Sequence, residues 1–88
     1  MDPRRLLIFR AVARAGSISA AARDLGWTQP AVSQHLRALE RSAGCALLIR
    51  GAGGVELTEP GRMLLARADA LAVQLHMAEE ELAELTAL

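Results

Sequence analysis

The order of apolar and polar residues along the chain predicts three short helices, a small hairpin and one long helix. The first helix is expected to begin after the capping residue Asp2, with Pro3 in its first turn and Gly16 beyond its last. Its apolar residues recur at helical spacing, so one face should pack on a core. These residues are Leu6, Phe9, Val12 and Ala13, with Leu7 and Ile8 beside them.

The stretch from Ser17 to Gly44 predicts two helices joined by a tight turn. Ser17 can accept a hydrogen bond from a free amide at the start of the first helix, and Gly26 can adopt the left-handed conformation that ends it. Thr28 can cap the second helix in the same way. This layout is typical of a helix-turn-helix, in which the second helix enters the major groove of DNA.

The second of these helices has one apolar and one polar side at 100° per residue. Its apolar side carries Ala31, Val32, His35, Leu36, Ala38 and Leu39. Its polar side carries Gln29, Pro30, Ser33, Gln34, Arg37, Glu40 and Arg41. An ordinary amphipathic helix with a solvated face is the alternative, but the preceding short helix and glycine turn favour a recognition helix.

Residues 46–57 predict a small β-hairpin. Two short runs, 46–50 and 55–57, flank the glycine-rich turn 51–54. We interpret this hairpin as a wing beside the recognition helix, with Arg50 as a contact to phosphate or to the minor groove. Two alternatives stay open: the glycines could let peptide amides approach phosphate, or the hairpin could be merely structural.

The last predicted helix is capped by Thr58 and meets no helix breaker up to Leu88. A length of about 28 residues corresponds to roughly 42 Å. A heptad seam of apolar residues runs along this helix. So small a domain cannot bury the whole seam, so we expect the helix to pair with the same helix of a second copy. The alternative is a helix that folds back on the core. The seam consists of Leu64, Ala68, Leu71, Leu75, Ala78, Leu82 and Leu85.

Composition adds few constraints. The chain has 88 residues, enough for one small domain, and its apolar residues are mainly alanine and leucine, which favour helices. No apolar run could span a bilayer, the N-terminus lacks a signal-peptide pattern, and Cys45 is the only cysteine. We therefore expect a cytoplasmic protein.

Charge is unevenly distributed along a chain whose formal net charge is zero. All ten basic residues are arginines within residues 1–67, which hold five acidic residues, so this part carries +5. Residues 68–88 hold five acidic residues and no basic one, so they carry −5. The positive charge of residues 1–67 suits a protein that binds DNA. This surplus of positive charge is modest, so two copies of the chain should be needed for useful affinity for DNA.

No set of residues predicts catalysis, a metal site or a cofactor. His35, His76 and Cys45 lack partners at metal-ligand spacing, so packing in the core or at its rim is the better interpretation. Trp27 is expected to be a plug under the recognition helix, with a partly exposed contact surface as the alternative. The acidic run 79–81 is expected to be solvated, although it could pair with Arg62 or Arg67 of an antiparallel partner.

One further pattern covers essentially the whole chain, and its most specific part is the block TQPAVSQHLRALE, residues 28–40. The residues that carry it are Phe9, Val12, Gly16, Ser17, Ala21, Ala22, Leu25, Gln29, Pro30, Ala31, Val32, Ser33, Leu36, Leu39, Glu40, Gly44, Leu47, Leu48, Arg50, Leu57, Thr58 and Gly61. The chain resembles the N-terminal DNA-binding domain of LysR-type transcriptional regulators. That resemblance implies a dimer on a pseudo-palindromic operator, antiparallel linker helices, and DNA contacts by Gln29, Pro30, Ser33 and Arg50.

The chain departs from the LysR pattern in three respects. Gln34 stands where arginine is frequent, which favours adenine over guanine as a bidentate partner. Gly53 and Glu56 replace basic wing residues, so salt dependence should be shallower. The effector-binding domain of such regulators is not part of this sequence, so we expect either an excised fragment or a natural single-domain protein, with no small-molecule effector site in this chain.

The predicted fold class is mainly α: a winged helix-turn-helix over residues 1–57 and a linker and dimerisation helix over residues 58–88. The predicted function is sequence-specific binding of double-stranded DNA by a dimeric bacterial regulator, without enzyme activity. Groove contacts are assigned to Thr28, Gln29, Pro30, Ser33, Gln34 and Arg37, and backbone contacts to Arg4, Arg5, Arg41 and Arg50.

Two rivals remain. Molybdate-responsive regulators share a similar fold and a similar GSISAAA-type segment, but the Gln29-Pro30-Ala31 block argues against them. A protein-interaction module on a winged-helix platform is the other, and the near-neutral net charge supports it.

Overall fold

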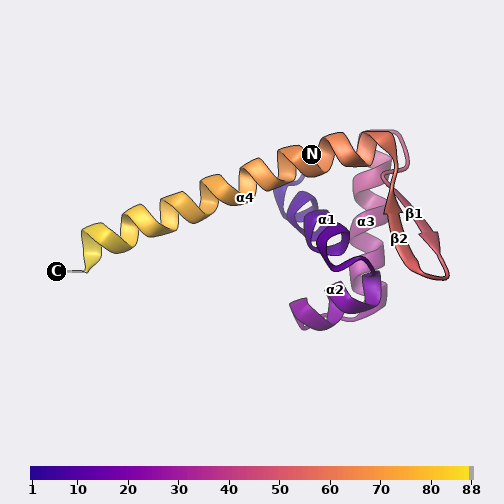
Figure 1. Ribbon diagram of the computed structural model, residues 1–88, viewed down its shortest axis with the longest axis horizontal. Helices are drawn as coiled ribbons and strands as arrows, with labels where there is room; N and C mark the ends of the chain where they lie inside the picture. The colour runs from indigo at the N-terminus through magenta and orange to yellow at the C-terminus, as the bar shows by residue number, and fades with distance from the viewer. Residues whose placement is uncertain (88) are drawn as a thin grey trace.

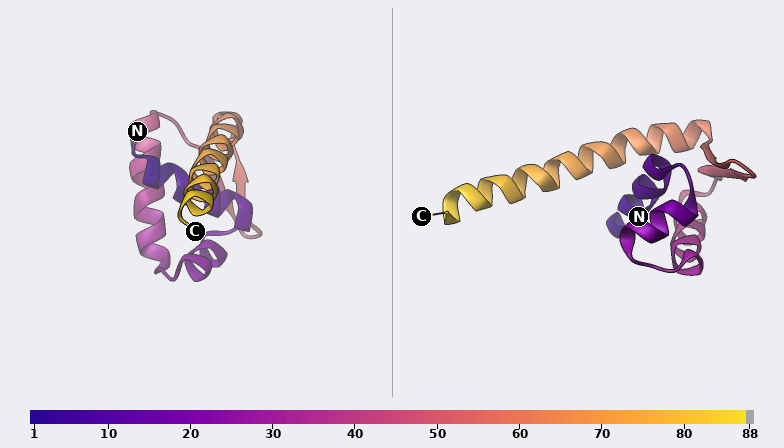
Figure 2. Two further views of the ribbon diagram at one scale, coloured as in Figure 1. Left: turned by 90° about the vertical axis from the view of Figure 1, so that its left-hand side faces the viewer. Right: turned by 60° about the horizontal axis from the view of Figure 1, so that its bottom comes forward.

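The computed structural model describes residues 1–87 as a small helical domain from which one long helix projects (Figure 1). The elements are α1 (Pro3–Ala15), α2 (Ile18–Leu25), α3 (Gln29–Ala43), β1 (Leu48–Gly51), β2 (Gly54–Leu57) and α4 (Glu59–Thr86). The molecule extends over 50 × 25 × 20 Å, and Figure 2 shows that α4 accounts for its long dimension. The predicted mainly helical winged helix-turn-helix is confirmed.

Local capping explains where the helices begin. The side chains of Asp2, Ser17, Thr28 and Thr58 each accept a hydrogen bond from a backbone N–H in the first turn of the helix that follows. The first three helices end at glycines with positive φ, as predicted. The last helix ends at Thr86, and Leu88, to which it was expected to extend, lies outside the described residues.

A single apolar core lies where α1, α2, α3 and the start of α4 meet. Phe9 and Val12 of α1 and Val32 of α3 are fully buried, and the small Ala21 and Ala22 let α2 approach closely. The other buried apolar residues of this core are Ile8, Leu36, Leu39, Leu47 and Leu64. Helices α2 and α3 pack on α1, and α4 also packs on α1, while one face of α3 stays exposed.

The hairpin is a two-stranded antiparallel sheet with a two-residue loop, Ala52 and Gly53. Its strands pair Leu48 with Leu57 and Gly51 with Gly54, so each strand is slightly displaced from the predicted limits. Directly after Gly54 in the chain, Val55 donates a hydrogen bond from its backbone N–H to the carbonyl oxygen of Gly16, at 2.9 Å. The hairpin is thus fastened to the turn between α1 and α2.

The start of α4 belongs to the core, which corrects part of the predicted dimer seam. Leu64 and Ala68 are 8% and 0% exposed, because they pack inside their own domain. The same helical spacing that suits a partner helix serves here to cover α1. Only Leu71, Leu75, Ala78, Leu82 and Leu85 of the predicted seam lie beyond this contact, and the division at residues 57 and 58 stays a prediction.

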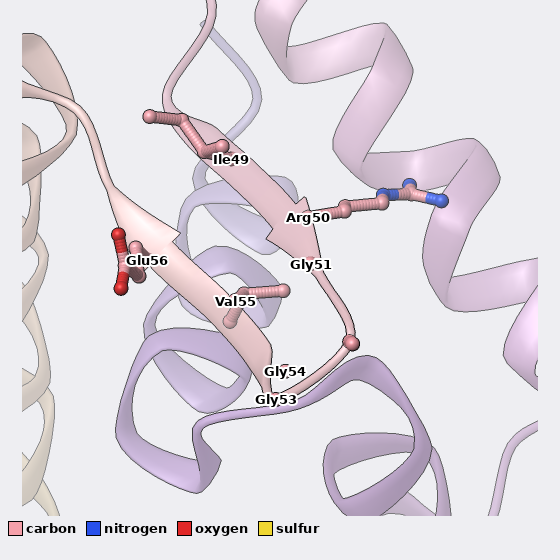
Figure 3. A pocket seen from close by; sticks show the side chains of 8 residues that line it. Ile49, Arg50, Gly51, Gly53, Gly54, Val55 and Glu56 are labelled. Atoms are coloured by element: carbon pink, nitrogen blue, oxygen red, sulfur yellow. The ribbon is translucent and has the colours of Figure 1, made fainter.

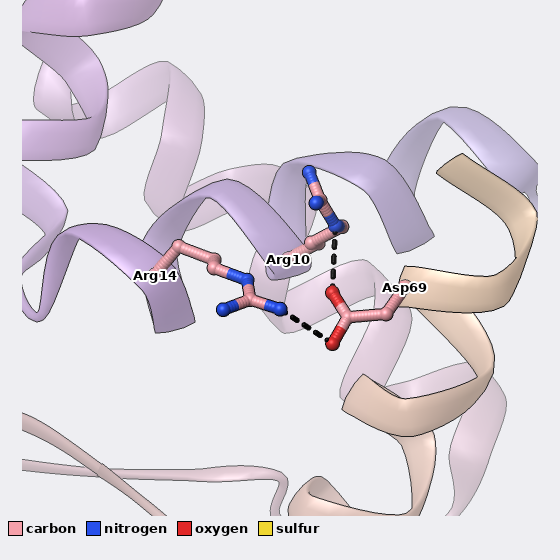
Figure 4. A network of polar contacts seen from close by, with 3 residues as sticks. All are labelled: Arg10, Arg14 and Asp69. Atoms are coloured by element: carbon pink, nitrogen blue, oxygen red, sulfur yellow. Dashed lines mark hydrogen bonds and ion pairs between the residues drawn. The ribbon is translucent and has the colours of Figure 1, made fainter. Parts of the chain in front are cut away.

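Two arginines of α1 fix the direction in which α4 leaves the domain. Arg10 and Arg14 each donate a hydrogen bond to one carboxylate oxygen of Asp69, both at 2.7 Å (Figure 4). The hydrogen bond from Arg14, followed by that from Arg10, lowers the pKa of Asp69 from its ordinary value of 3.8. This cluster was not predicted, because its partners lie more than fifty positions apart in the sequence.

Replacing Asp69 with asparagine should lower stability at neutral pH and remove part of its acid sensitivity. Because the folded pKa of Asp69 lies below its unfolded value, the carboxylate stabilises the fold above pH 3.8, and this is lost as pH falls through the folded value. Urea unfolding of wild type and Asp69→Asn should give a gap in the free energy of unfolding at pH 7 that closes below pH 3.8. A gap that is equal at both pH values, or equal to that of exposed Asp24→Asn, would contradict this assignment.

Candidate nucleic-acid interface

The N-terminal half of α3 exposes a row of polar side chains. Thr28 caps the helix through its hydroxyl, and Gln29, Pro30, Gln34 and Arg37 are all exposed. Two side-chain amides and one guanidinium therefore stand on the free face of a helix, where they can donate to and accept from base edges. All five positions are accessible, as a recognition surface requires.

Ser33 is the exception among the predicted groove residues. Its side chain is only 9% exposed, so its assignment to the exposed polar side of α3 is wrong. Both α1 and α2 pack on α3, which makes the buried arc of this helix broader than a single stripe. The groove contact expected of Ser33 therefore has no support from an exposed position on α3, and only the LysR resemblance still favours it.

The wing and the helix-turn-helix enclose a shallow hollow of about 200 Å³. Gln29 at the start of α3 and Arg50 of β1 both line it, together with Ser19 of α2 and the backbone of Gly54. Figure 3 shows Arg50 extending from β1 away from Glu56. Arg50 thus shares a surface with the recognition helix, as predicted, and Ser19 is an addition that the sequence did not suggest.

Glu40 anchors the wing, a role missed in the sequence. It was assigned to the polar side of α3, but its carboxylate accepts hydrogen bonds from the backbone N–H groups of Leu47, at 2.7 Å, and Leu48, at 3.4 Å. The hydroxyl of Thr58 donates to the carbonyl oxygen of Ala46 at 2.8 Å and so joins the wing to α4. The only sign of this role in the sequence was that the pair Leu39-Glu40 belongs to the LysR pattern. That pattern does not indicate which residues Glu40 contacts.

The other predicted backbone contacts lie apart from the hollow. Arg4 forms an ion pair with Asp2 at 3.3 Å and keeps 87% of its side chain exposed. Arg5 is half-buried, and its Nε atom has no hydrogen-bond partner within residues 1–87. Arg41 is exposed in the last turns of α3, beside Arg37. These three arginines are available to phosphate, but the structure does not bring them to Arg50.

Trp27 is a partly exposed surface residue rather than a plug. Its indole ring is stacked at a tilt on His35, with ring centroids 5.4 Å apart, and the residue stays 43% exposed. Within residues 1–87 no group of histidine, cysteine or acidic side chains is arranged to hold a metal ion. None of the helices in this part of the chain is long and apolar enough to cross a membrane.

A family model fits most of the sequence. Residues 3–62 match the model described as bacterial regulatory helix-turn-helix protein, lysR family. The chain belongs to the lysR family. The match covers the helix-turn-helix, the wing and the start of α4, which are the elements that build the surface described above.

Relatives within the lysR family are much longer than this chain. The HTH-type transcriptional regulator TdcA of Escherichia coli (strain K12) is 44% identical over 66 residues, which are 75% of this chain and 21% of TdcA. The chain thus spans about a fifth of the length of this regulator.

Two solved structures share the fold over the whole chain. The CbnR DNA-binding domain in complex with DNA has a TM-score of 0.82 and 35% identity, and the match covers 100% of both chains. The complex of the BenM DNA-binding domain with catB site 1 DNA has a TM-score of 0.90 and 28% identity, over 100% of this chain and 99% of that one. These lysR-family matches do not favour a protein-interaction module on a winged-helix platform.

Proposed function

We propose that this chain is the DNA-binding part of a bacterial LysR-type transcription regulator that binds a pseudo-palindromic operator as a dimer in the cytoplasm. The observation that carries the proposal is the free face of α3, which presents Gln29, Gln34 and Arg37 beside Arg50 of the wing. The fold matches, over its full length, two domains that were crystallised with DNA.

The side chains on this surface fall into two groups, those suited to contact bases and those suited to contact the DNA backbone. Gln29 and Gln34 can each form two hydrogen bonds with adenine in the major groove, so we assign sequence reading to them. Thr28, Pro30 and Arg37 lie around them and complete the groove contacts. We assign Arg50 to a phosphate, with Arg4, Arg5 and Arg41 as further backbone contacts.

The modest charge of one copy and the shape of the chain support a dimer. Residues 1–67 carry +5, whereas tight phosphate binding draws on many cations, and two copies double that number. The half of α4 beyond the domain is exposed and carries Leu75, Leu82 and Leu85, which are 45%, 62% and 76% exposed. Covering these residues with a second copy would set two recognition helices on one duplex.

Removing Arg50 should weaken binding to every duplex by a similar factor. If Arg50 binds one phosphate in each copy, the slope of log K against log salt should fall by about one for each phosphate that Arg50→Ala leaves free. Fluorescence anisotropy of labelled duplexes over a range of salt measures this slope. Arg50→Lys is the matched control and should keep the slope, because it keeps the charge. Binding by the wild type that does not depend on salt would contradict the proposed function.

A further inference from the structure

Helix α4 is held to the domain over a short stretch, and most of its length projects away from it (Figure 2). Leu64 and Ala68 are buried in the core, whereas residues 73–86 are all exposed. Asp69 lies between these two parts of the helix. The contacts around Asp69 therefore decide the direction in which the exposed part of α4 points.

Asp69 forms a two-point contact with α1 at the place where α4 leaves the domain. Arg10 and Arg14, one helical turn apart on α1, each donate to a different oxygen of its carboxylate, both at 2.7 Å (Figure 4). Within residues 1–87, the side-chain hydrogen bonds and ion pairs beyond Asp69 join residues of α4 only to one another. We call Arg10, Arg14 and Asp69 the Asp69 clamp.

Apolar packing and the Asp69 clamp restrain α4 in different ways. Apolar packing is not directional, so Leu64 and Ala68 keep α4 on the domain without fixing its angle. Hydrogen bonds weaken steeply when their length or angle departs from the optimum. Because the clamp binds one carboxylate from two points along α1, a tilt of α4 lengthens at least one of its bonds. The clamp therefore fixes the angle of α4.

We infer that Asp69 is a positioning residue that sets the distance between the two half-sites to which a dimer of this chain binds. A second copy held on the exposed part of α4 moves with that part. The angle fixed at Asp69 therefore determines where the second recognition helix lies. This inference rests on the proposed function, to which it adds the residue that determines the spacing of the operator.

The length of α4 makes this angle decisive. From Asp69 to Thr86 the helix runs for about 17 residues, or roughly 25 Å at 1.5 Å per residue. A tilt of about 10° at Asp69 would move the far end by roughly 4 Å, which exceeds the rise of about 3.4 Å per base pair. One base pair also turns a half-site by about 35° around the duplex. A fixed α4 therefore favours one spacing, and a loosely held α4 accepts several.

Parallel selection from a random duplex library by the wild type and Asp69→Asn tests the inference. Asparagine keeps one acceptor oxygen, but its amide nitrogen cannot accept a hydrogen bond from the second arginine. The wild type should enrich one spacing about tenfold over spacings one base pair longer or shorter, and Asp69→Asn less than about threefold. The base preference within each half-site should stay the same. A merely structural role for Asp69 would lower affinity at every spacing and leave this ratio unchanged.

Two further variants separate the clamp from a general loss of charge. Arg14→Ala removes the donor of one of the two bonds and should broaden the spacing as Asp69→Asn does. Arg23→Ala removes an exposed arginine of α2 that has no ion-pair partner within residues 1–87, and it should keep the spacing of the wild type. Broadening in Arg23→Ala as well, or none in Arg14→Ala, would contradict the inference.

A distance measurement without DNA tests the clamp itself. Spin labels on the native Cys45, after α3, and on Glu79→Cys of α4 occupy exposed positions and report the angle between α4 and the domain. Dilution with unlabelled Cys45→Ser chain limits the signal to pairs of labels within one copy. The distribution of label distances should be narrow with Asp69 and broader with Asp69→Asn. Equal widths would overturn the inference.

The outcome can be separated from that of the proposed function. A wild-type chain that binds no duplex would refute the proposed function and, with it, a role of Asp69 in spacing. A wild-type chain that enriches a two-part site, with the same range of spacings as Asp69→Asn, would overturn this inference and leave DNA binding intact.

Discussion

Replacing Gly54 with alanine should lower the free energy of unfolding by about 3 kcal/mol. The backbone of Gly54 has a φ of +121°, which side chains with a Cβ rarely adopt, and an added Cβ would overlap the carbonyl oxygen of Gly16. That carbonyl also accepts the hydrogen bond from Val55 that fastens the wing to the domain. Relief of the overlap requires the hairpin to move away from the turn between α1 and α2.

The neighbouring glycine provides the control for this effect. A Cβ on Gly53 would meet no atom within 4 Å, and the backbone there needs no positive φ. Urea unfolding of Gly53→Ala should therefore change stability by less than about 0.5 kcal/mol. Because Gly54 and Arg50 line the same hollow, Gly54→Ala should also weaken duplex binding. Equal stability of the two variants would show that the wing is not fastened to Gly16.

Replacing Gln34 with alanine should remove discrimination at one base pair in each half-site. Gln34 is exposed on the free face of α3, and its amide can donate to and accept from adenine in the major groove. Without this amide, binding should weaken by about 1–3 kcal/mol for the preferred base and hardly at all for the others. The binding curves of the four possible base pairs should therefore converge.

Competition between duplexes that differ at one base pair measures this discrimination. Ser42→Ala, at the exposed far end of α3, is the control and should keep the preference of the wild type. A uniform fall in affinity in Gln34→Ala, with the base preference intact, would instead assign Gln34 to the DNA backbone.

The elements of this fold could be predicted because their limits are set by nearby residues. Ser17 and Thr28 cap the helix that follows each of them within three positions, and Gly26 ends α2 by its own conformation. Arg50 was assigned to the wing because it follows a short apolar run that precedes a glycine turn. Such features depend on a few neighbouring residues, which a sequence displays directly.

Contacts between distant segments could not be predicted in this way. Glu40 has the chemistry of a solvated residue, yet it binds the backbone at Leu47 because the chain folds back after α3. Ser33 is polar, yet it is buried because a second helix widens the covered side of α3. In both cases the deciding partner is a backbone or helix whose position depends on the completed fold.

The seam of α4 illustrates a different ambiguity. An apolar spacing of three and four residues indicates that one face of a helix is covered, but not by what. Leu64 and Ala68 are covered by the domain itself, whereas Leu82 and Leu85 stay exposed. Only the structure separates the residues of this spacing that complete the core from those that stay exposed.

Selection of bound duplexes from a random DNA library is the measurement that tests the central claim most directly. Sequence-specific binding by a dimer predicts an enriched site with two related halves in dyad symmetry, about one helical turn or a multiple apart. Such a site requires a recognition helix that reads bases and two copies held in a fixed relation. A library that shows no enrichment at low salt would contradict sequence-specific DNA binding by this chain.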